Sequence, residues 1–138
     1  MADDLRAILK SLSPRLNDGK YSVGTFSEAQ MMGLAKYMPQ IFCIFREKEG
    51  LTVVFSSDVE SDMQLYTEKN IQGPFALITL DVLSSLMSVG LLGRVTGELA
   101  KEKIACNAFS AYHHDHLLVP YDKRDAALSV LKKIQKTA

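Results

Sequence analysis

The stretch that decides the fold is residues 75–112, FALITLDVLSSLMSVGLLGRVTGELAKEKIACNAFSAY. Its first eight residues form a nearly continuous apolar run, which predicts a buried strand. Over residues 90–103 the apolar positions recur every three or four residues and place Leu91, Val95 and Leu99 on one side, which predicts a helix. A second β-prone run ends the stretch. We therefore expect a strand, a serine-containing loop, a helix and a strand.

The rest of the chain repeats this pattern. After an N-terminal helix, the order strand, helix, hairpin, helix occurs twice. Residues 51–58, LTVVFSSD, resemble residues 117–122, LLVPYD, because in both a strand runs into an acid-capped helix. The polar segment 67–73 is the expected linker. The sequence thus predicts a duplicated unit, with the N-terminal helix and first unit in residues 1–69 and the second unit in residues 70–138.

Composition limits the classes of function. Of the 138 residues, 47% are apolar and 23% are charged, and 16 Lys plus Arg balance 16 Asp plus Glu. A chain without net positive charge is a poor binder of nucleic acid. We expect no secretory signal and no membrane span. Cys43 and Cys106 lie in apolar runs and are expected to be reduced core thiols, a disulfide between them being the less favoured alternative. These features together predict a cytoplasmic protein.

The loop between Asp81 and Gly90 is the candidate ligand site. The helix that follows it exposes N–H groups and a positive dipole end, which suit a carboxylate, and serine hydroxyls add hydrogen bonds. Asp81 is placed to face an ammonium group. The candidate binding residues on the loop, the helix start and the adjacent strand are Asp81, Ser84, Ser85, Ser88, Val89, Gly90, Leu91, Asn107 and Phe109. The alternative is that Ser88 only caps the helix and Gly90 only allows close packing.

Other candidate chemistry receives less support. His113, His114, Asp115 and His116 include metal-ligand types, but neighbouring residues of a strand point to opposite faces, so a polar turn is favoured over a metal site. No residue pattern predicts a nucleophile, a carboxylate pair or a phosphate loop. We therefore expect no catalytic residue, no metal and no cofactor, and a protein that is not an enzyme.

Several segments resemble one known family. Residues 89–104, VGLLGRVTGELAKEKI, resemble the first helix of an ACT domain, and residues 75–81 and 107–112 are placed like the strands on either side of it. Residues 112–120 and 45–54 are similar to segments of small bacterial proteins with two ACT-like units. One departure from the family is that many ACT domains carry an acidic residue and Pro before the helix-start glycine, where this chain has Ser88 and Val89.

The resemblance implies a fold and a function. The implied fold is α+β, with two tandem ACT-like units of the ferredoxin-like βαββα type, antiparallel sheets, helices packed on one face, and an added N-terminal helix. ACT domains bind amino acids or other small effectors between units and have no catalytic residues of their own. The implied function is therefore regulatory binding of a small-molecule effector, with amino acids as the first candidates. The alternative is a module for oligomerisation or protein interaction without a ligand. Gly93 and Gly97, one helical turn apart, favour close packing, and we expect a homodimer.

Overall fold

The computed structural model describes residues 2–82 and 84–138. The chain forms two compact units. One is Gly19–Phe75, here called the inserted unit, and the other is Ala76–Ala138 together with the chain up to Asp18, here called the discontinuous unit. Each unit is described separately below.

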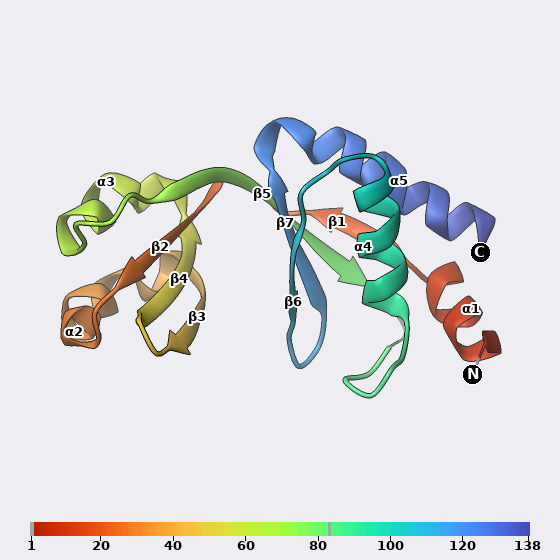
Figure 1. Ribbon diagram of the computed structural model, residues 1–138, viewed down its shortest axis with the longest axis horizontal. Helices are drawn as coiled ribbons and strands as arrows, with labels where there is room; N and C mark the ends of the chain where they lie inside the picture. Colours follow the sequence, from red (N-terminus) through yellow and green to blue (C-terminus); the bar gives the residue numbers. More distant parts are fainter. Residues whose placement is uncertain (1, 83) are drawn as a thin grey trace. The chain divides into compact units, whose positions relative to one another are not determined.

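The inserted unit has the order strand, helix, hairpin, helix, strand (Figure 1). Its sheet has the order β3-β4-β2-β5, and β2 pairs with β4, and β4 with β3, in antiparallel register. Both helical segments are short and mix α and 3₁₀ turns. Its elements are β2 (Tyr21–Phe26), η1 (Glu28–Gln30), α2 (Met31–Leu34), η2 (Ala35–Gln40), β3 (Ile41–Glu47), β4 (Gly50–Ser56), η3 (Ser57–Val59), α3 (Glu60–Met63), η4 (Gln64–Tyr66) and the first residues of β5 (Gln72–Asp81).

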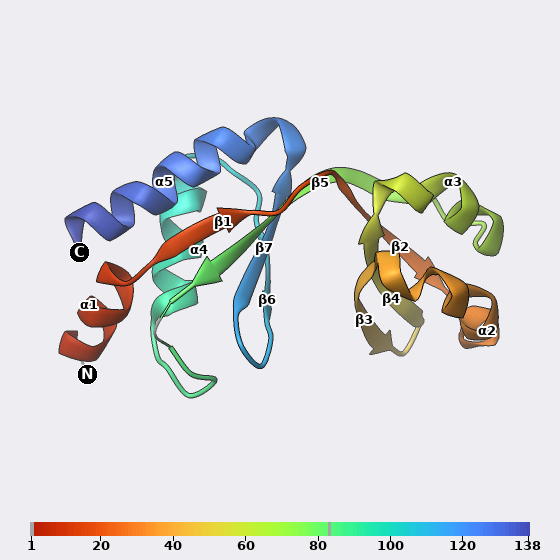
Figure 2. The same cartoon turned by 180° about the vertical axis from the view of Figure 1, so that it is seen from behind.

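The discontinuous unit is built from both ends of the chain (Figures 1 and 2). Its sheet has the order β1-β5-β7-β6, with β1 antiparallel to β5 and β6 antiparallel to β7. Besides the later residues of β5, its elements are α1 (Ala2–Lys10), β1 (Ser13–Leu16), α4 (Leu91–Lys101), β6 (Asn107–Ser110), β7 (Asp115–Pro120), η5 (Tyr121–Lys123) and α5 (Arg124–Thr137).

The two sheets have the same strand order. In the inserted unit β2 lies between β4 and the antiparallel start of β5. In the discontinuous unit β5 lies between β7 and the antiparallel β1. The inserted unit takes its fourth strand from the start of β5, whereas the discontinuous unit takes it from β1. The prediction of two ferredoxin-like units with antiparallel sheets and an added N-terminal helix is therefore confirmed, and the structure adds that one unit is inserted into the other.

The placement of the N-terminal helix differs from the expected division into residues 1–69 and 70–138. Ile8, Leu9 and Leu12 are buried in the core of the discontinuous unit, among side chains from β5, α4, β7 and α5. The apolar stripe of α1 is visible in the sequence, but the surface that it covers is set by tertiary packing.

Strand β1 is absent from the sequence prediction. This strand contains Pro14, which has no N–H and cannot donate a ladder hydrogen bond. In the discontinuous unit β1 lies at the edge of the sheet and pairs with β5 alone, opposite Leu80 at this position. Edge strands tolerate proline. The expected linker 67–73 is also shorter than predicted, because β5 begins at Gln72 and pairs with β2.

The helices of the discontinuous unit cover one face of its sheet. Ala76, Ile78 and Leu80 of β5 belong to the same buried cluster as the apolar stripes of α4 and α5. Because side chains alternate along a strand, Leu77, Thr79 and Asp81 point to the other face, here called the helix-free face. The inserted unit has its own core around Phe26, Leu34, Val53, Phe55 and Met63. None of the described helices is long and apolar enough to cross a membrane.

Candidate functional site

A long connection between the first strand and the first helix occurs in only one of the two units. In the inserted unit, β2 ends at Phe26 and η1 begins at Glu28, so one residue joins them. In the discontinuous unit, β5 ends at Asp81 and α4 begins at Leu91. The serine-rich segment 84–90 occupies this connection, and two hollows lie beside it.

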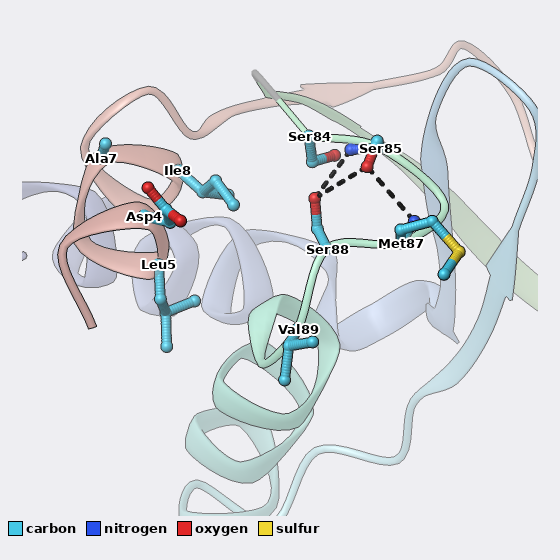
Figure 3. Close-up of a pocket in the computed structure, with 9 residues that line it drawn as sticks. All are labelled: Asp4, Leu5, Ala7, Ile8, Ser84, Ser85, Met87, Ser88 and Val89. Atoms are coloured by element: carbon cyan, nitrogen blue, oxygen red, sulfur yellow. Dashed lines mark hydrogen bonds between the residues drawn. The ribbon is translucent and has the colours of Figure 1, made fainter. Parts of the chain in front are cut away.

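Two serines of this segment stabilise its conformation. Ser88 Oγ accepts a hydrogen bond from the backbone N–H of Ser85 at 2.8 Å, and Ser85 Oγ accepts one from the N–H of Met87 at 3.2 Å (Figure 3). The N–H of Ser88 donates to the carbonyl of Ser85 at 3.0 Å. Ser88 therefore does not cap α4, whose N-cap position is Gly90 and has no side-chain cap.

The larger hollow at this segment lies against the N-terminal helix. It has a volume of about 650 Å³ and is here called the α1 hollow. Figure 3 shows the loop serines and the α1 side chains on its two sides. Its lining residues are Asp4, Leu5, Ala7, Ile8, Ser84, Ser85, Met87, Ser88 and Val89. Among the described residues of this lining Asp4 is the ionisable one, and its carboxylate favours a ligand with a cationic group on the α1 side.

A smaller hollow lies at the start of α4. It has a volume of about 160 Å³ and is here called the α4 hollow. Loop serines, the first residues of α4 and the turn between β6 and β7 line it. The first N–H groups of a helix have no intrahelical partner and form a positive dipole end, so this hollow suits a carboxylate or another small anion. His113 and His114 stand at its hairpin side.

Both backbone conformation and packing explain why residue 90 is a glycine. Its φ of +100° lies in the left-handed region, which favours glycine. A Cβ at this position would lie 3.0 Å from Cδ2 of Leu5 on α1. The missing side chain thus makes room for α1, a partner that the sequence did not reveal. Gly93 and Gly97 have open space where a Cβ would be.

The structure brings together only part of the predicted site. Ser84, Ser85 and Ser88 line both hollows, Val89 lines the α1 hollow, and Gly90 and Leu91 line the α4 hollow. Asp81, Asn107 and Phe109 line neither hollow. The α1 wall of the site was not predicted, because its residues precede the loop by about eighty positions and no local pattern connects the two.

Asp81 is engaged elsewhere. Its Oδ2 accepts a hydrogen bond from Arg15 Nε at 3.2 Å, and its Oδ1 lies 3.6 Å from His114 Nδ1. Phe109 and Asn107 pair across the hairpin with His116 and Leu118, whose side chains alternate with the core residues of β7. The sequence placed these three residues around a ligand, whereas the structure places them around the helix-free face.

Polar residues on three strands form a network on this face. Arg15 Nη1 donates to Asn17 Oδ1 at 3.3 Å, Asn17 Nδ2 donates to Thr79 Oγ1 at 2.9 Å, and Thr79 Oγ1 lies 2.9 Å from His116 Nδ1. Burial of the imidazole, followed by the nearby His114, lowers the pKa of His116. Because Asp81 bonds to Arg15 and approaches His114, the network reaches the hairpin turn that lines the α4 hollow.

Comparison with known proteins identifies related sequences and folds. Two protein-family models match the chain, and both describe an ACT domain, one over residues 2–70 and the other over residues 72–133. No curated protein sequence matches the chain.

Solved structures match almost the whole chain. VC0802 from Vibrio cholerae, a protein of unknown function, is 30% identical with a TM-score of 0.83, and the match covers 97% of this chain and 98% of that one. Atu0741 from Agrobacterium tumefaciens is 16% identical with a TM-score of 0.65, covering 90% and 89% of the two chains. The regulatory subunit of aspartate kinase from Thermus flavus is 8% identical with a TM-score of 0.68, covering 90% and 96%.

Proposed function

This chain belongs to the ACT domain family, and on that premise we propose that it is a regulatory protein that binds a small effector, with amino acids as the first candidates. The observation that carries the proposal is the pair of hollows on either side of the serine loop, in the one unit that has this long connection. Such binding requires no catalytic group.

The chemistry of the two hollows matches the two charges of an amino acid. The uncapped start of α4 favours an anion by about 0.3–1 kcal/mol, and each hydrogen bond to a charged group adds roughly 1.5–3 kcal/mol. Asp4 and the serine hydroxyls of the α1 hollow offer acceptors to an ammonium group. We propose that Asp4 contributes the carboxylate on this side, a role that the sequence gave to Asp81, which bonds to Arg15.

Distant relatives suggest which ligand to test first. The fold is shared with the regulatory subunit of aspartate kinase from Thermus flavus and with a part, 32%, of the chain of Escherichia coli aspartokinase III, which was solved in complex with aspartate and ADP. At 8% and 15% identity these likenesses concern the fold alone. They place aspartate first in a panel of the amino acids.

Thermal-shift measurement with the amino-acid panel tests the proposal, because a ligand that binds only the folded chain raises its melting temperature.

Calorimetry then compares the wild type with Ser84→Leu. This substitution places a larger side chain where both hollows meet, without removing the hydroxyls of Ser85 and Ser88 that hold the loop. Ser61→Leu, at an exposed position of α3 in the inserted unit, is the matched control. We expect at least one amino acid to bind the wild type and the control, and to bind Ser84→Leu at least tenfold more weakly, a loss of about 1.4 kcal/mol. Binding by no member of the panel, or unchanged binding by Ser84→Leu, would contradict the proposal.

A second candidate function is self-association through the same end of the discontinuous unit. Four large apolar side chains around the hollows are exposed: Leu86 by 62%, Met87 by 86%, Val89 by 68% and Tyr112 by 81%. Exposed apolar clusters are typical of interaction surfaces. We propose a homodimer on this basis. Light scattering at micromolar concentration should give twice the chain mass, and the double variant Met87→Ser, Tyr112→Ser should shift the mass toward that of one chain.

A further inference from the structure

Asp81 is placed between two basic side chains. It is the last residue of β5, and its two carboxylate oxygens face different partners. Oδ2 accepts the hydrogen bond from Arg15 on β1, whereas Oδ1 lies 3.6 Å from Nδ1 of His114. This second approach is too long for a hydrogen bond but short enough for an ion pair if the imidazole is charged.

Protonation of the His114 ring changes its contact with Asp81. Its Nδ1 is buried and, within residues 2–82 and 84–138, has no hydrogen-bond partner. A neutral ring presents either a lone pair or an uncharged N–H to the carboxylate from this buried nitrogen, according to its tautomer. A protonated ring presents an N–H and a positive charge to the same oxygen, which draws the two groups together. Imidazole is the side chain that ordinarily changes charge between about pH 5 and pH 8.

We propose that protonation of His114 acts as a latch that closes the β6–β7 turn against the end of β5 and thereby shapes the α4 hollow. The effect on a ligand rests on the proposed function, whereas the latch itself does not.

The turn is placed to respond to this contact. The N–H of Ala111 donates to the carbonyl of His114 at 2.9 Å, and this bond closes the turn, whose residues line the α4 hollow. In Figure 1 the turn and the loop after β5 lie at the same end of the discontinuous unit. Asp81 directly precedes that loop. A tighter contact between His114 and Asp81 therefore acts on both walls of the α4 hollow.

The charged and titratable groups around His114 set the size of the effect. Arg15 on β1 bonds to Asp81 and opposes a second positive charge. Asp115 follows His114 in the chain and favours its charged form, whereas a charged His113 would oppose it. The ring of His116 lies 6.3 Å from that of His114, and burial lowers the pKa of His116, which reduces the positive charge on this neighbour.

Amide hydrogen exchange of the full-length, ligand-free chain tests the latch. Protection of residues 111–114 is measured at about pH 8 and about pH 5.5, after correction for the intrinsic exchange rates. We expect protection to rise by about two- to fivefold at the lower pH, the range for a half-exposed ion pair. His114→Gln and Asp81→Asn should abolish the rise. His113→Gln, which removes the neighbouring histidine of the same turn, should retain it.

Arg15→Gln provides an independent check, because it removes the cation that competes for Asp81 and leaves the carboxylate in place. This variant should show a larger rise than the wild type. Equal protection of the wild type at both pH values, or a rise that persists in Asp81→Asn, would overturn the latch. Failure to find a ligand would overturn the proposed function and leave the exchange result unchanged, so the two failures are distinguishable.

Discussion

The hydroxyl of Thr79 on β5 bridges Asn17, which directly follows β1, and His116 on β7. Thr79 is 2% exposed, its Oγ1 accepts from Asn17 Nδ2 at 2.9 Å, and it lies 2.9 Å from His116 Nδ1. Because a hydroxyl has one hydrogen and two lone pairs, Thr79 can also donate to an unprotonated Nδ1 of His116 or accept from its N–H. The direction of the pKa shift of His116 comes from burial of its ring, which lowers the pKa.

The first prediction is a pH dependence of stability from His116. A histidine whose pKa is lower in the folded than in the unfolded chain stabilises the fold fully above about pH 6.5, and this contribution is lost as the pH falls from there toward the folded-state pKa. Urea unfolding at about pH 7.5 and about pH 5 should therefore show a loss of stability on acidification that is smaller in His116→Gln than in the wild type. His113→Gln is the control and should behave as the wild type. Equal losses in the wild type and His116→Gln would contradict this assignment.

The second prediction separates two glycines of the same helix start. Gly90→Ala introduces a Cβ in a left-handed conformation and 3.0 Å from Leu5, so we expect it to lower the free energy of unfolding by about 1–3 kcal/mol. Gly93→Ala meets open space inside α4 and should raise that free energy by about 0.5–1 kcal/mol. Chemical denaturation measures both. A destabilised Gly93→Ala would indicate that a second chain packs against this part of α4.

The third prediction tests which unit the N-terminal helix stabilises. Leu9 is buried in the core of the discontinuous unit, so Leu9→Ala should cost about 2–5 kcal/mol. Amide hydrogen exchange should accelerate first in β7 and α5. It should change less in β2, β3 and β4, although these strands are nearer to α1 in the sequence. Acceleration confined to β2, β3 and β4 would instead support the boundary at residue 69.

The fourth prediction concerns the two free cysteines. Burial raises the pKa of Cys43 and of Cys106 to about 11. Since the thiolate is the reactive form, a rise of about two pKa units leaves about a hundredfold less of it near neutral pH. Alkylation by iodoacetamide at about pH 8 should be at least tenfold slower in the native chain than in urea. Equal rates would show that both thiols are accessible and ionise normally.

The sequence by itself determined the elements whose signals are local. The stripe of Leu91, Val95 and Leu99 gave α4 and its buried face, and the repeat of strand, helix, hairpin and helix gave the duplicated ferredoxin-like unit. The serine loop was predicted correctly as the long connection before α4. Each single helix, strand or loop depends on residues within about fifteen positions of one another, where side-chain periodicity reports burial directly. The duplication follows from comparing the order of these elements in the two halves.

Only the tertiary structure decided the long-range pairings. Strand pairing of Ser13–Leu16 with β5 makes one unit discontinuous, brings Asp4 and Leu5 to the serine loop, and gives Asp81 to Arg15 rather than to a ligand. Periodicity shows that a strand or helix has an apolar face but not which distant segment covers it. That choice depends on packing and hydrogen bonds between residues more than sixty positions apart, and no local pattern records it.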